Sequence, residues 1–156
     1  MPVTTITVSQ LITCQVSDAF DAFVEPSRIT QFWISSTTGP LSEGAKVTWQ
    51  FMVPGAVDTV TVDIFKRPSL FQLAWSDGSK TRFEFSESAG DNTKVSITAE
   101  VSAGADLMDQ VVNTTEGYSI VLCDLKTLLE SGRSANLVRA KAELIASSMV
   151  ATKDDA

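Results

Sequence analysis

The sequence predicts a single α+β domain in which a curved antiparallel sheet wraps around one long C-terminal helix. Its 156 residues are the size of one domain. Apolar residues alternate with a period of two along most of the first hundred residues, which indicates strands, and then recur with a helical period. Because the predicted helices lie at the two ends of a strand meander, the pattern favours α+β over a parallel βαβ fold.

The chain begins with a strand at residues 4–14, in which apolar and hydroxyl side chains alternate. Ser17 can then cap a short helix, which Pro26 ends. Proline is well tolerated as a first helical residue, so a second short helix is expected over Pro26–Trp33.

A meander of five strands should follow, because short alternating segments are separated by turn signals such as Pro54-Gly55, Asp77-Gly78 and Gly90. The expected strands cover residues 46–53, 57–66, 70–75, 81–86 and 94–102. Together with the first strand they make a sheet of about six strands. Each strand is expected to turn one apolar face inward, as Val60, Val62 and Ile64 do in the second of the five.

The long helix should cover residues 106–130, with Asp106 as N-cap and Gly132 just beyond its C-terminal end. Thr114, Thr115 and Gly117 interrupt its apolar stripe. A mid-helix glycine costs about 1 kcal/mol relative to alanine, so we interpret the interruption as a close approach or a polar spot on the buried face.

The domain itself is expected to end near residue 132. Residues 133–156 form a C-terminal extension, with a short amphipathic helix over Ser134–Met149 and a solvated tail. An amphipathic helix needs an apolar surface to cover. We therefore expect this helix to pack on its own domain or to form a homodimer contact.

Charge and composition exclude several functions. Nineteen acidic residues against 12 basic ones give a net charge of −7, which disfavours nucleic acid as a partner. No basic-then-apolar leader is visible, and no apolar run is long enough to span a membrane, so residence in the cytoplasm is expected. The absence of histidine removes Ser-His-Asp and Cys-His catalysis and imidazole metal sites. We expect neither a metal nor a cofactor.

A ligand pocket is expected between the concave face of the sheet and the long helix. Its candidate lining residues are Trp33, Trp49, Phe51, Trp75, Phe83, Phe85, Met108, Val111, Thr115, Tyr118 and Leu122. Such a set makes an apolar cavity with a few polar groups, as in small-molecule sites, but the same rings can simply fill a core.

Tyr118 is the best candidate for a polar group that contacts a ligand, although its hydroxyl can instead reach solvent at the pocket mouth. The strand carboxylates Asp63, Glu84 and Glu100 fit a solvated sheet face better than acid–base chemistry. We name no catalytic residue.

Four segments carry a resemblance to a known family: Val16–Trp33, Leu41–Val47, Pro68–Trp75 and Gly117–Glu130. In their order and spacing they resemble the START-like (SRPBCC) superfamily, and within it the family related to the C-terminal domain of the Hsp90 ATPase activator. The resemblance covers about residues 4–132 and implies the helix-grip fold. The sequence departs from the family at Tyr118, where tryptophan is more common, and in the extension from Arg133.

The resemblance implies several functions, because relatives include lipid and hormone carriers, co-chaperone domains and polyketide cyclases. Our leading hypothesis is a non-enzymatic domain that binds a small apolar or lipid-like ligand. The alternative is a co-chaperone that binds a chaperone. A third is a cyclase-like enzyme, for which Tyr118 would be the ionisable group.

Overall fold

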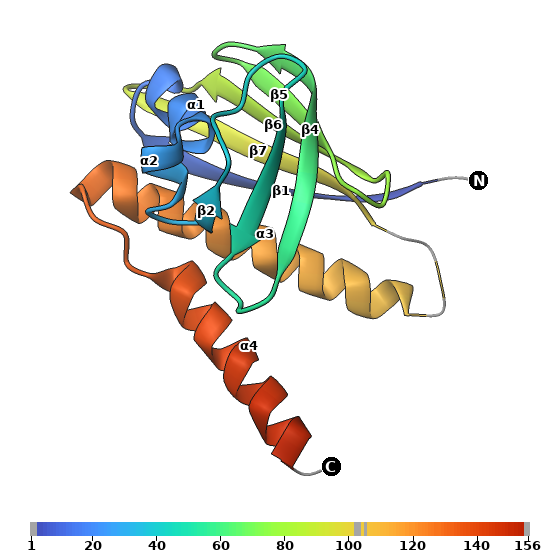
Figure 1. Ribbon diagram of the computed structural model, residues 1–156. Coiled ribbons are helices and arrows are strands. Elements are labelled where there is room, and N and C mark those ends of the chain that lie inside the picture. Colours follow the sequence, from blue (N-terminus) through green and yellow to red (C-terminus); the bar gives the residue numbers. More distant parts are fainter. Residues whose placement is uncertain (1–2, 102–103, 105, 155–156) are drawn as a thin grey trace.

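In the computed structural model, residues 3–101, 104 and 106–154 are described (Figure 1). The elements are, in order, β1 (Thr4–Thr13), α1 (Val16–Val24), α2 (Pro26–Ile29), β2 (Ile34–Thr37), β3 (Lys46–Phe51), β4 (Val57–Lys66), β5 (Leu70–Ala74), β6 (Lys80–Glu87), β7 (Asn92–Val101), α3 (Leu107–Ser131) and α4 (Leu137–Asp154). The α+β class and the long C-terminal helix packed on the sheet are as predicted.

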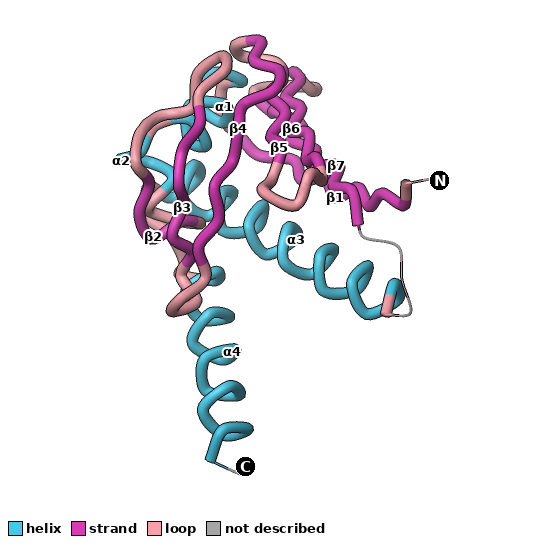
Figure 2. The backbone as a smooth tube through the Cα atoms, turned by 45° about the vertical axis from the view of Figure 1, so that its right-hand side comes forward, coloured by secondary structure: helices cyan, strands magenta, loops and turns pink. Residues whose placement is uncertain are grey.

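The seven strands form one antiparallel sheet in the order β1-β7-β6-β5-β4-β3-β2. The first strand therefore pairs with the last, from Thr4 opposite Val101 to Thr13 opposite Asn92. The sheet curves, and α1, α2 and α3 lie on its concave side (Figure 2). Most apolar strand residues face these helices, and hydroxyl pairs such as Thr7–Thr98 occupy the opposite face.

Aromatic rings fill the concave side where α1 and α2 cover it. Phe20 and Phe23 on α1 meet Phe71, Phe83 and Phe85 of the sheet with ring centroids 5.1–6.1 Å apart. All five rings are buried. This end of the molecule is a packed core.

The structure corrects the sequence prediction in several places. The N-cap of α1 is Gln15, so Ser17 lies inside that helix and does not cap it. The second helix ends at Ile29 instead of Trp33, and the chain then forms a short edge strand, β2, which the sequence did not indicate. In β4 a register shift falls between Val62 and Ile64. Ile64 pairs with half-exposed Gln72 and lies on the outer face, while Phe65 turns inward against Phe20. A bulge of this kind exchanges the two faces of a strand, which a strict period of two cannot foresee.

The link between α3 and α4 is held by one buried carboxylate. α3 ends at Gly132, whose φ of 83° is in the left-handed region that glycine favours, and the Gly132 N–H donates to the Leu128 carbonyl. Asp124, only 1% exposed, then accepts hydrogen bonds from the Ser134 hydroxyl and the Ala135 N–H. With Ser134 and Ala135 tied in this way, α4 begins at Leu137, later than predicted.

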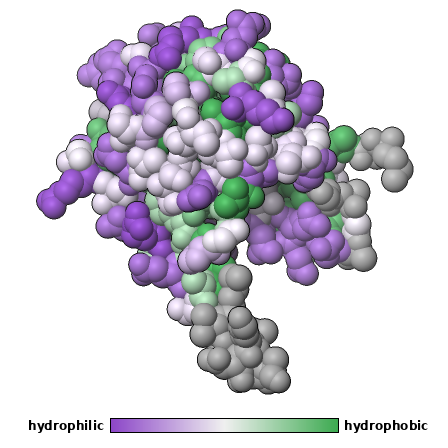
Figure 3. Space-filling view, in the orientation of Figure 1, coloured by the Kyte–Doolittle hydropathy of each residue, from purple (hydrophilic) through white to green (hydrophobic). Residues whose placement is uncertain are grey.

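From this link α4 runs away from the sheet (Figures 1 and 2). In Figure 3 much of the visible surface is hydrophilic, and hydrophobic side chains gather where α4 meets the body. Within the part of the chain that the structure describes, no helix has the length and apolar character needed to cross a membrane.

Candidate functional site

A cavity of about 440 Å³ lies between the concave face of the sheet, α3 and the first half of α4. Its size is that of a site for a small organic molecule. The lining residues come from both sides of the cavity and are Trp33, Phe51, Met52, Val53, Asp58, Trp75, Asp77, Ser79, Thr81, Ala99, Glu100, Thr114, Gly117, Tyr118, Ile120, Val121, Val138, Lys141, Ala142 and Ile145.

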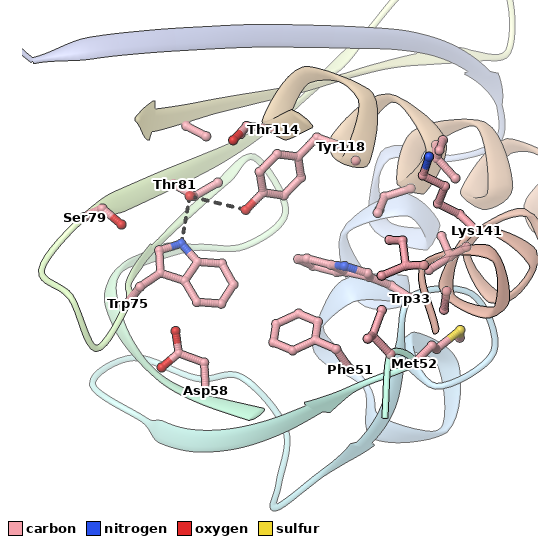
Figure 4. A pocket seen from close by; sticks show the side chains of 18 of the residues that line it. Trp33, Phe51, Met52, Asp58, Trp75, Ser79, Thr81, Thr114, Tyr118 and Lys141 are labelled. Carbon is pink, nitrogen blue, oxygen red and sulfur yellow. Dashed lines mark hydrogen bonds between the residues drawn. The ribbon is translucent and has the colours of Figure 1, made fainter. Parts of the chain in front are cut away.

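Four aromatic side chains surround the cavity (Figure 4). The Trp33 ring lies 6.0 Å from that of Tyr118, and the Phe51 ring lies 6.2 Å from that of Trp75, measured between centroids. These rings come from the loop before β2, from β3, from the residue that follows β5, and from α3. The wall is therefore apolar and is assembled from segments far apart in the sequence.

A short hydrogen-bonded chain lies on one wall of the cavity. Trp75 donates from Nε1 to the Thr81 hydroxyl at 2.8 Å, and that hydroxyl lies 3.5 Å from the Tyr118 hydroxyl (Figure 4). Burial raises the pKa of Tyr118 to about 12, so the phenol stays neutral at physiological pH. It can donate to a ligand carbonyl or accept from a ligand hydroxyl or amine.

The charged residues of the lining are unevenly distributed. Asp58, Asp77 and Glu100 belong to the sheet and its hairpins, whereas Lys141 comes from α4. Lys141 is already paired with Glu116 on α3, at 2.5 Å. Hydrogen bonds from the Ser79 hydroxyl and backbone N–H lower the pKa of Asp77. The sheet side of the cavity is therefore anionic.

Of the eleven residues predicted to line a pocket, four do so: Trp33, Phe51, Trp75 and Tyr118. Four others are buried in the packed core, namely Trp49, Phe83, Phe85 and Leu122. Strand alternation sends all of these strand rings inward, but α1, α2 and α3 cover some of them completely.

The three remaining predicted residues lie on α3. Met108 is 75% exposed, because it is near the N-terminal end of α3 and faces solvent, while Val111 packs against the core. Thr115 is half-buried outside the cavity, and its neighbour Thr114 lines it instead. Gly117 makes no close approach, since an added Cβ would meet no atom within 4 Å.

The sequence prediction missed several lining residues. Asp58 had a usable signal, because it shares strand parity with the inward Val60 and Val62. The α4 residues Lys141 and Ala142 had none, since nothing local indicates where a C-terminal helix will dock. Among the described residues, no group of three or more Cys, Asp or Glu side chains could hold a metal ion.

No protein-family model and no curated protein sequence matches the chain. Solved structures do match it. Protein SSP2350 of Staphylococcus saprophyticus aligns with a TM-score of 0.76 and 24% identity over 84% of this chain and 95% of that one. Aha1 from Colwellia psychrerythraea, solved as a dimer, aligns with a TM-score of 0.73 and 16% identity. The alignment covers 84% of this chain and 99% of that one.

These likenesses decide the fold. The chain has the helix-grip fold. CalU16 of Micromonospora echinospora shares it, with a TM-score of 0.67 and 18% identity over 95% of this chain and 89% of that one. Residues before Leu137 make up about 87% of the chain (136 of 156), so the CalU16 match also includes part of α4. The helix-grip fold expected from the sequence resemblance is confirmed.

Proposed function

We propose that this protein binds a small, largely apolar molecule in the cavity between the sheet, α3 and α4. The aromatic wall supplies apolar contact, and the neutral Tyr118 hydroxyl supplies one polar contact that fixes orientation. The cavity volume of about 440 Å³ suits a ligand with a bicyclic or tricyclic core.

The proposal depends most on the presence of a glycine, Gly117, in the cavity wall. A glycine in the middle of α3 weakens the helix, yet an added Cβ would meet nothing within 4 Å. Packing therefore does not require glycine there. Because Gly117 lines the cavity between Thr114 and Val121, its missing side chain keeps space that a larger residue would occupy. Space for a ligand accounts for a residue that the fold alone would not select.

A co-chaperone role remains the alternative. It is supported by the helix-grip likeness to the Aha1 dimer and by the sequence resemblance to the Hsp90 activator family. A homodimer stays a prediction on the same basis. A cyclase-like reaction has less support, because a phenol with a pKa of about 12 is a poor acid or base at neutral pH.

The test uses binding of the apolar fluorescent dye N-phenylnaphthylamine to purified protein. Gly117→Phe should fill part of the cavity and weaken dye binding at least about tenfold, a loss of ~1.4 kcal/mol. Gly117→Ala is the matched control, because it removes the same glycine but takes little space. It should keep dye affinity. Equal affinity of wild type and Gly117→Phe, with both folded by circular dichroism, would contradict the proposal.

A further inference from the structure

Asp58, a carboxylate of the cavity wall, has no charged partner among the described residues. Asp58 lies on the inward face of β4, opposite buried Trp49 in the β3–β4 ladder. One of its oxygens accepts a hydrogen bond of 2.7 Å from the Thr59 N–H. Among the described residues, no Lys or Arg lies within ion-pair distance of Asp58, or of its neighbours in the lining Asp77 and Glu100.

A carboxylate on the outer face of the same strand, in contrast, has a charged partner. Asp63 on the same strand accepts from Gln72 at 2.7 Å and pairs with Lys80 at 3.1 Å. Asp58 is half-buried beside apolar rings, where a counter-charge would offset the cost of its partial removal from water. At Asp58 this partner is not supplied by the described chain.

The rings beside Asp58 favour a cation as well. In Figure 4 the Asp58 carboxylate lies beneath the Trp75 indole, and Phe51 faces the same space. Aromatic faces attract organic ammonium groups, tryptophan most strongly. Lys141, the lining residue that carries a positive charge, lies near Trp33 on the far side of the cavity and is paired with Glu116.

We propose that the cavity selects ligands that carry a positively charged amino group on an apolar body, with the ammonium held between Asp58 and the Trp75 ring. This inference rests on the proposed binding function and names the ligand class. The apolar body would lie along Phe51 and Trp33, within reach of the Tyr118 hydroxyl. Anionic ligands of the same shape are disfavoured, because Asp58, Asp77 and Glu100 repel them.

Three probes with one ring system test the charge requirement: naphthylmethylamine, naphthylmethanol and naphthoic acid. At neutral pH they are cationic, neutral and anionic, and quenching of tryptophan fluorescence reports binding. The amine should bind wild type about tenfold more tightly than the alcohol, and the acid most weakly. In Asp58→Asn the amine should lose this advantage while the alcohol keeps its affinity.

Asp63→Asn is the matched control, since it removes a carboxylate from the outer face of the same strand and should leave the amine preference intact. If amine and alcohol bind wild type equally, the charge inference is wrong and the binding function stands. If the Asp58→Asn variant keeps the full amine preference, Asp58 is not the counter-charge and the inference also falls. If none of the three probes binds, the binding function itself is contradicted.

Discussion

The concave face of the sheet has two ends that use the same kind of residue differently. Under α1 and α2, the rings of Phe23, Phe71 and Phe83 are buried and pack against one another. Toward α4, the rings of Phe51 and Trp75 are half-buried and face a cavity. The difference shows that strand alternation turns a ring inward, whereas the covering helices decide whether it fills a core or lines a site.

The largest expected effect tests the packed end. Phe23→Ala removes a ring that contacts five others and should lower the free energy of unfolding by about 3–5 kcal/mol. Phe51→Ala should cost only about 1–2 kcal/mol, because its half-buried ring borders existing space. Urea denaturation of both variants measures the difference. Equal losses would show that the two ends are packed alike.

The sequence predicts the packed core under α1 and α2 and the cavity near α4 to different extents. Periodicity found the strands and the long helix, because local side-chain patterns determine those elements. It could not separate Trp49 and Phe85 from Phe51 and Trp75, since that depends on where distant helices dock. It also missed the β4 bulge that turns Phe65 inward, and the contribution of α4 to the cavity.

A smaller effect is expected at the link that places α4 over the cavity. Asp124→Ala removes the acceptor of the Ser134 hydroxyl and one of the two acceptors of the Ala135 N–H, which also donates to the Thr127 hydroxyl, and should cost about 1–3 kcal/mol. Hydrogen exchange should accelerate in α4 but not in β6 or β7. Uniform acceleration across the chain would mean that Asp124 supports the whole fold instead of the α4 end.

The smallest effect concerns Tyr118, the single tyrosine of the chain. Ultraviolet titration of the phenol in the folded protein should show a midpoint near 12, against about 10 for a solvated tyrosine. Because the folded pKa is raised, the unfolded chain ionises first, and stability should fall as pH rises from about 10 toward 12. A midpoint near 10 would place the hydroxyl in solvent and remove the polar group of the cavity.

The position of α4 separates part of the cavity wall from the residues that stabilise the fold. The residues that line the cavity from α4, Val138, Lys141, Ala142 and Ile145, belong to the segment that contributes least to the sheet and its core. Under the proposed binding function, substitutions there would alter which molecules are accepted while the scaffold keeps its stability. On that proposal, changes confined to α4 would vary ligand preference without changes to the sheet or to α1 and α2.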